Sequence, residues 1–229
     1  MKFISAGKHG DLVFVVDVTG SMVPEIKQLK AAVGTLHRMG VVVNRLQTFF
    51  DRFVLVTVND PTIKSYSFKS FNKFADTINR LRAHGGGDCP EPLYKGLQRA
   101  LSISRRHSMI LLFTDASPKY PALFTSTKRL ALAKRVRINI FAFGSCGKRF
   151  AARTRVFYSL SKLTLSSYYI TTKKSISLVR SVNCLLNIST VSQARTSFPT
   201  DFQTSHVHHQ EQLCLAVLLA ERLRQHKNQ

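Results

Sequence analysis

Tryptophan is absent from this 229-residue sequence, and acidic residues and cysteines are scarce. Only 12 Asp and Glu stand against 34 Lys and Arg, which gives a formal net charge of +22 at pH 7. The four cysteines form no CxxC pair, so we expect neither a zinc ribbon nor a disulfide-dense scaffold. The apolar runs at residues 12–16 and 213–220 are much shorter than the roughly 20 residues of a membrane-spanning helix, so no transmembrane segment is predicted.

The shortage of acidic residues leaves one strongly basic block. Residues 116–200 contain 15 Lys or Arg and no Asp or Glu. A field of this sign attracts polyanions and speeds their association. Two interpretations stay open: a solvated basic surface, or a polyanion-binding module that acts through residues 119–195. For the second, a sulfated glycan is favoured over nucleic acid, because no nucleic-acid recognition motif is present. The candidate contacts are Lys128, Arg129, Lys134, Arg135, Arg137, Lys148, Arg149, Arg153 and Arg155.

The sequence has enough apolar residues for a core, since 44% of the chain is hydrophobic. Four short runs that are apolar on both faces are typical of central strands in a parallel sheet: 12–16, 53–58, 109–113 and 138–143. Helical spacing of apolar residues predicts four helices: 26–36, 71–81, 93–101 and 150–163. Alternation at residues 62–68 predicts an antiparallel edge strand. The pattern therefore predicts an α/β domain over residues 10–185, with a doubly wound, mainly parallel sheet and helices on both faces.

The two ends of the chain differ in composition from this domain. Residues 1–9 form an N-terminal extension without the apolar stretch of a secretory signal. Residues 186–210 are expected to be a polar linker, and residues 211–229 a C-terminal helix. Asn187 begins the one N-glycosylation sequon, which matters only outside the cell. The compartment stays open between an intracellular chain and a secreted one whose start lies outside this sequence.

Oxygen-bearing side chains follow two of the predicted strands and one predicted helix. Asp17, Thr19 and Ser21 come directly after the first strand, and Asp115 follows the run at 109–113. The glycine-rich segment 85–91 contains Asp88. Ligands bind at the carboxyl ends of the strands in open α/β sheets, and carboxylates with hydroxyls are the donors that a hard divalent cation prefers. Asp, Thr and Ser also cap helices, so only the three segments together predict a metal site.

These three segments resemble a known family. DLVFVVDVTGSM, HGGGDCPEPLYKGL and ILLFTDAS are similar to the three blocks of a von Willebrand factor A (vWA) domain. The wording GGGDCPE is most similar to the domain at the start of hemicentin-like extracellular matrix proteins. The resemblance implies a six-stranded vWA sheet of Rossmann-like type, an extracellular location and a metal-ion-dependent adhesion site.

In such a site, Asp17, Thr19, Ser21 and Asp115 would bind Mg²⁺, or Mn²⁺ or Ca²⁺. Thr19 and Ser21 would ligate directly, and the two carboxylates would hold coordinated waters. Asp88 stands where the family commonly has a Thr ligand, so it would either ligate or orient a bound water. An acidic side chain of a protein partner would complete the coordination.

Two further expectations concern chemistry near this site. No Ser or Cys is tied by motif to a His, so no catalytic site is predicted and the domain is expected not to be an enzyme. Cys89 and Cys146 follow elements that should end at the same edge of the sheet, so they are candidates for a disulfide if the protein is secreted, and much weaker candidates if it is cytosolic.

Overall fold

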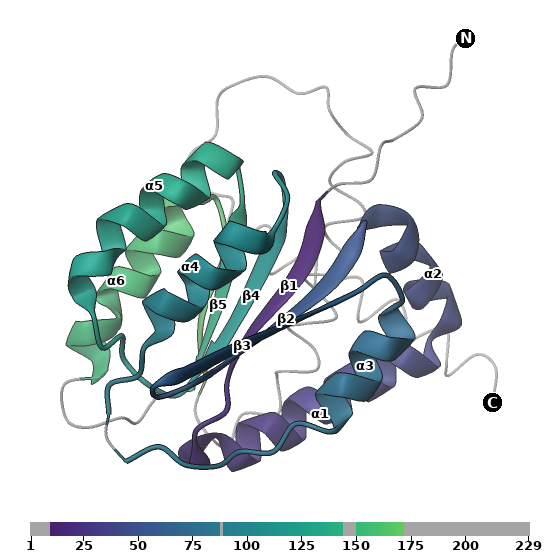
Figure 1. Cartoon of the computed structure of the whole chain (residues 1–229), viewed down its shortest axis with the longest axis horizontal. Coiled ribbons are helices and arrows are strands. Elements are labelled where there is room, and N and C mark those ends of the chain that lie inside the picture. Colours follow the sequence, from purple (N-terminus) through teal and green to yellow (C-terminus); the bar gives the residue numbers. More distant parts are fainter. Residues whose placement is uncertain (1–9, 88, 144–149, 172–229) are drawn as a thin grey trace, which may run out of the picture. The chain divides into compact units, whose positions relative to one another are not determined.

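The apolar runs of the sequence form a six-stranded sheet in the computed structural model (Figure 1). The strands are β1 (Asp11–Asp17), β2 (Arg52–Asn59), β3 (Thr62–Phe68), β4 (Met109–Thr114), β5 (Arg137–Phe143) and β6 (Tyr168–Thr171). Their order in the sheet is β3-β2-β1-β4-β5-β6. Strand β3 is antiparallel to β2, and every other pair of neighbours is parallel. The prediction of a mainly parallel sheet with an antiparallel edge strand is confirmed.

The structure describes residues 10–87, 89–143 and 150–171. The chain divides into two units, residues 1–180 and 181–229, and all described residues belong to the first. The predicted N-terminal extension, linker and C-terminal helix, with Asn187, therefore lie outside the described residues. Within the described ranges, no helix has both the length and the apolar character needed to cross a membrane.

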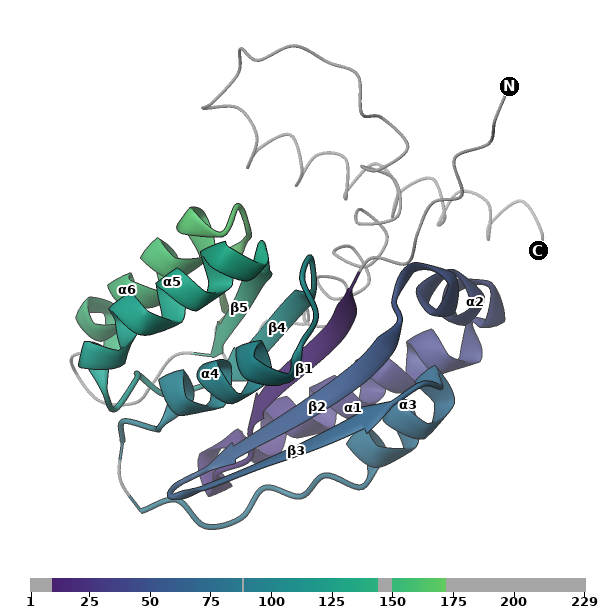
Figure 2. The same cartoon turned by 45° about the horizontal axis from the view of Figure 1, so that its top comes forward.

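Helices cover both faces of the sheet (Figures 1 and 2). One face carries α1 (Val23–Arg38), α2 (Gly40–Phe49) and α3 (Phe71–Asn79). The other carries α4 (Leu93–Ile103), α5 (Phe124–Lys134) and α6 (Phe150–Leu163). Pro24 occupies the first turn of α1, where its missing N–H is no loss. The doubly wound arrangement predicted from the alternation of strands and helices is thus confirmed.

The apolar periodicity does not predict α2, α5 or the position of β6. Helix α2 begins two residues after α1 ends, and only Met39 lies between them. Helix α5 buries only Thr127 and Ala131, so its sequence shows almost no apolar stripe. Strand β6 is four residues long and contains two tyrosines. In each case tertiary contacts fix an element whose local pattern is too short or too weak to indicate it.

Strand β1 lies at the centre of the core, and all seven of its residues are buried. On one face of the sheet, Phe14 packs edge-on against Phe74 of α3 and lies against Phe113 of β4. On the other face, Val13 and Val15 belong to the cluster that includes Leu97 of α4. Because β1 is held on both faces, the chain leaves the core at Asp17 in a fixed position. The core therefore positions the polar segments that follow.

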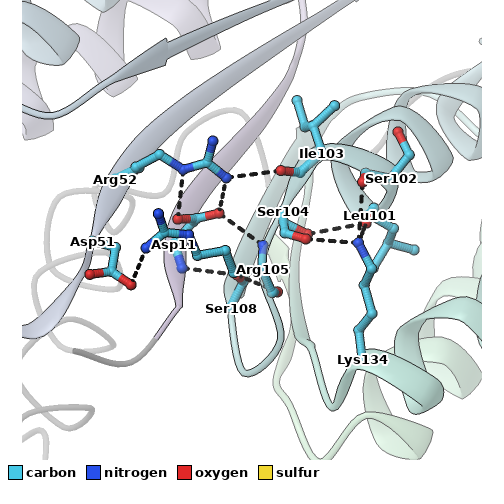
Figure 3. Close-up of polar contacts among 10 residues, drawn as sticks. All are labelled: Asp11, Asp51, Arg52, Leu101, Ser102, Ile103, Ser104, Arg105, Ser108 and Lys134. Carbon is cyan, nitrogen blue, oxygen red and sulfur yellow. Dashed lines mark hydrogen bonds and ion pairs between the residues drawn. The ribbon is translucent and has the colours of Figure 1, made fainter. Parts of the chain in front are cut away.

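A polar cluster lies at the opposite end of β1 (Figure 3). We call it the Asp11 cluster, and it consists of Asp11, Arg52, Arg105 and Ser108. Arg52 donates to both carboxylate oxygens of Asp11, from Nε at 3.1 Å and from Nη2 at 2.7 Å. The Arg105 backbone N–H donates to Asp11 Oδ2 at 2.9 Å, and Ser108 Oγ accepts from the Asp11 N–H at 2.8 Å. These bonds join β1, β2 and the loop between α4 and β4.

Candidate metal centre

The predicted site residues meet because β1 and β4 are parallel neighbours. Val16 pairs with Phe113, so both strands end at the same edge of the sheet. Asp17 ends β1, and Asp115 comes directly after β4. A single turn of 3₁₀ helix, Gly20–Met22, follows β1 and places Ser21 at this edge, within hydrogen-bond distance of Asp115.

Side-chain hydrogen bonds join the predicted ligands in two pairs, and the two pairs lie side by side. Thr19 Oγ1 donates to Asp17 Oδ1 at 2.7 Å, and Ser21 Oγ donates to Asp115 Oδ1 at 3.0 Å. The two hydroxyl oxygens are 3.5 Å apart. The structure thus brings together four of the five predicted metal residues, from segments 94 positions apart in the sequence. The fifth, Asp88, lies outside the described residues.

Thr114 is a site residue that sequence reasoning missed. Its Oγ1 donates to Asp17 Oδ2 at 2.8 Å and accepts from the Ala116 backbone N–H at 2.9 Å. Thr114 therefore binds Oδ2 of Asp17, whereas Thr19 binds Oδ1. The available signal was its place directly before Asp115 in the TDAS segment.

Asp17 is fully buried, and its hydrogen-bond partners in the described part of the chain are hydroxyls and one backbone N–H. Burial raises the pKa of Asp17 from its usual 3.8 to about 6, since a charged carboxylate is costly in a desolvated place. The bonds from Thr19 and Thr114 lower the pKa and offset part of this effect, whereas the charge of Asp115 raises it further. A cation bound beside Asp17 would stabilise its ionised form.

The glycine-rich loop is held against this site by its backbone. The Gly20 N–H donates to the Gly85 carbonyl at 2.9 Å, and the His84 N–H donates to the Val18 carbonyl at 2.9 Å. Gly86 has a φ of +76°, and a Cβ placed on it would lie 2.9 Å from Cβ of Thr19. Glycine is therefore required at 86 both for backbone conformation and for space.

The donor set fits a hard divalent cation. Two carboxylates and two hydroxyls are oxygen ligands of the kind that Mg²⁺, Mn²⁺ and Ca²⁺ accept, and Mg²⁺ keeps several waters besides. In the part of the chain that the structure describes, no group of three or more His, Cys, Asp and Glu side chains could hold a metal ion. The hydroxyls of Thr19 and Ser21 would therefore have to supply part of the coordination.

Cys89 forms a disulfide in the structure. Its expected partner, Cys146, lies outside the described residues, so the Cys89–Cys146 pairing stays a prediction. His84, which borders the glycine-rich loop, has Nδ1 at 3.0 Å from the carbonyl of Arg82.

The basic candidate contacts differ in their surroundings. Arg129, Arg135 and Arg155 are exposed, and Lys128 is half-buried. The ammonium group of Lys134 donates hydrogen bonds to backbone carbonyls at the end of α4, including that of Ser104 at 2.8 Å (Figure 3). Burial lowers the pKa of Arg137. The structure does not describe the side chains of the three remaining candidates, which are Lys148, Arg149 and Arg153.

The chain matches the sequence model of the family described as von Willebrand factor A domain over residues 11–182. It is 28% identical to hemicentin-1 from Homo sapiens over 169 residues, which are 73% of this chain and 3% of hemicentin-1. It is 35% identical to von Willebrand factor A domain-containing protein 7 from Homo sapiens over 130 residues, which are 56% of this chain and 14% of that protein. The chain therefore spans a small part of the length of these curated relatives.

Among solved structures, the fold is similar to that of the SpRpn10 VWA domain, with a TM-score of 0.52 and 14% sequence identity. That match covers 77% of this chain and 95% of the other, and it shows the fold alone. The family match covers most of the chain, including the strands that carry Asp17 and Asp115. The chain belongs to the von Willebrand factor A domain family.

Proposed function

We propose that this vWA domain binds a divalent cation at Asp17, Thr19, Ser21 and Asp115 and uses it to bind a protein partner through an acidic side chain. Two hydrogen-bonded pairs, Thr19 with Asp17 and Ser21 with Asp115, carry the proposal, because their hydroxyl oxygens are 3.5 Å apart. They gather four oxygen-bearing side chains at one edge of the sheet and leave the buried Asp17 without a Lys or Arg among its described partners.

Each residue has a separate role in this proposal. The hydroxyls of Thr19 and Ser21 already donate their protons to carboxylates, so their lone pairs are available to a cation. Asp17 and Asp115 supply the negative charge and accept from coordinated waters, while Thr114 holds Asp17 in place. The cation, when bound, supplies a positive centre that an incoming carboxylate can ligate. Asp88 would add a third carboxylate, either as a ligand or through a water.

We propose an extracellular location and no catalytic role. The disulfide of Cys89 supports an oxidising compartment, because disulfides are rare where thiols are kept reduced. Family membership supports a role in protein binding. The chemistry assigned to the cation is ligand exchange with a carboxylate, which needs no nucleophile or general base.

Calorimetric titration with Mg²⁺, Mn²⁺ and Ca²⁺ tests the proposal. We expect binding at millimolar concentrations or below, a rise in melting temperature with the ion, and loss of both effects in Asp17→Asn. Asp76→Asn is the matched control, because Asp76 is an exposed carboxylate on α3. Absence of binding by all three ions in the unmodified chain would overturn the proposal.

A second candidate function is binding of a sulfated glycan through the basic block. The favouring observation is that Arg129, Arg135 and Arg155 are exposed on or beside α5 and α6, in a block with no acidic residue. Binding to heparin should then weaken steeply with salt and persist in EDTA, whereas metal-bridged binding should vanish in EDTA. Retention of heparin binding by Arg129→Gln/Arg135→Gln/Arg155→Gln would exclude this surface.

A further inference from the structure

An apolar groove of about 250 Å³ lies between α1 and the segment that follows α3. Val23 and Ile26 of α1 line one side, and Leu81 and Ala83 line the other. Val23 is 59% exposed, although it is a large apolar residue at the start of a helix. The groove is smaller than the roughly 300–1,000 Å³ of typical small-molecule sites, so it suits one apolar side chain and not a cofactor.

Three cationic side chains surround this groove: Lys27, Lys30 and Arg82. Their aliphatic stems contribute to its apolar lining, as long basic side chains commonly do. No described carboxylate forms an ion pair with any of the three. An apolar floor with an unbalanced basic rim is complementary to an apolar side chain flanked by acidic ones.

Both sides of the groove are close in sequence to the candidate metal centre. Helix α1 begins at Val23, two residues after Ser21. On the other side, Ala83 precedes His84 and Gly85, whose backbones bond to Val18 and Gly20. Figure 1 shows the chain after α3 running beside α1 toward the start of that helix. A protein segment that reaches the metal centre could therefore continue into the groove.

We propose that this groove, which we call the α1 groove, binds an acidic segment of a protein partner by seating one apolar side chain of that segment. The flanking carboxylates of the segment face Lys27, Lys30 and Arg82. The inference rests on the proposed function in one respect: the same partner supplies the carboxylate that ligates the cation. The α1 groove then supplies specificity that a single carboxylate lacks.

Fluorescence anisotropy with the full chain and a labelled acidic peptide, GDEDLDEDG, tests this inference. Two companion probes are GDEDSDEDG, which lacks the apolar side chain, and GNQNLNQNG, which lacks the charges. Each is measured with millimolar Mg²⁺ and with EDTA. We expect the leucine peptide to bind several-fold more tightly than the serine peptide, and the uncharged peptide to bind most weakly.

Two variants of the chain locate the effect. Lys27→Gln/Lys30→Gln/Arg82→Gln should weaken binding of the acidic peptides by on the order of tenfold, because three cations are removed. Lys64→Gln/Lys69→Gln/Lys73→Gln loses the same charge away from the groove and should change binding much less. Ala83→Leu should fill the α1 groove and abolish the preference for leucine over serine.

Photo-crosslinking keeps the test independent of the folding of any variant. A peptide with photo-leucine at its centre should label residues 23–30 and 81–83 of the unmodified chain. Labelling at other residues overturns the inference. Absence of labelling also overturns it and would indicate that another segment of the chain, or a second copy, occupies the groove.

The two proposals fail in different ways. Equal binding of the leucine and serine peptides in both Mg²⁺ and EDTA overturns the α1 groove, whatever the cation does. A leucine preference that survives in EDTA, with no cation binding by calorimetry, supports the groove and overturns the metal centre.

Discussion

The two ends of β1 carry aspartates in opposite circumstances. Asp11 and Asp17 begin and end the same strand, and both are fully buried. Asp11 receives two hydrogen bonds from the guanidinium of Arg52 and one from a backbone N–H. Asp17 receives hydrogen bonds from two hydroxyls and a backbone N–H. One carboxylate is neutralised by the chain itself, and the other lacks such a cation among its described partners.

This difference lies in how the buried charge of each aspartate is compensated. A buried carboxylate is tolerated when a cation and hydrogen bonds compensate its desolvation, as at Asp11. Where compensation is incomplete, the pKa rises, as it does at Asp17. Under the proposed function, a bound cation would supply at Asp17 the compensation that Arg52 supplies at Asp11.

Replacement of Arg52 should produce the largest effect. Arg52→Met keeps most of the apolar stem but leaves the carboxylate of Asp11 buried without its cation. We expect the free energy of unfolding to fall by about 3 kcal/mol or more, measured by urea denaturation. Arg106→Met, at an exposed arginine, is the matched control. Similar stability of the two variants would contradict the assigned role of the Asp11 cluster.

Asp17→Asn should change the free energy of unfolding in the opposite direction and raise it in the metal-free protein. The amide keeps the shape of the carboxylate and removes its desolvated charge, so the metal-free protein should become more stable by about 2 kcal/mol near neutral pH. The same change should abolish stabilisation by Mg²⁺. Urea denaturation with and without the ion measures both effects. A large loss of stability in the metal-free state would mean that Asp17 is as well compensated as Asp11.

A glycine substitution tests how closely the loop must approach Thr19. Gly86→Ala places a methyl group 2.9 Å from Cβ of Thr19 at a φ of +76°. We expect a loss of about 1–2 kcal/mol and weaker cation binding, because Thr19 is displaced. Gly87→Ala is the comparison, since an added Cβ there meets no atom within 4 Å. Equal effects of the two substitutions would show that the close approach does not matter.

The pH dependence should give the smallest effect. Because the pKa of Asp17 is raised to about 6, folding favours its protonated form, and the contribution of Asp17 to the stability of the metal-free protein falls as pH rises from about 4 through about 6. A cation instead needs the ionised form. Cation affinity should therefore drop by about tenfold between neutral pH and about pH 5, as measured by calorimetry. An affinity that does not change with pH would remove Asp17 from the site.

Much of the fold is predictable from local sequence. The runs of β-branched and aromatic residues at 12–16 and 109–113 are buried on both faces of the sheet. Such continuous apolar runs are typical of central parallel strands, so the sequence predicts both strands. Helix α5 is different, because its buried positions are Thr127 and Ala131 and its place depends on α4 and α6. The segments that form the candidate metal centre could be predicted from their motifs. The hydrogen bond from Thr114 to Asp17 could not, because the sequence does not show which residue a hydroxyl contacts.

By itself, the sequence determined the first five strands, four of the helices and the residue types at the carboxyl ends of β1 and β4. These follow from local patterns, namely apolar periodicity and short polar motifs. Only the tertiary structure decided that Arg52 neutralises Asp11 and that Asp17 is left with hydroxyls. It also decided that residues of α1 and of the segment 81–83 line one open groove. Charge compensation and cavities depend on segments distant in the chain, and packing alone brings those segments together.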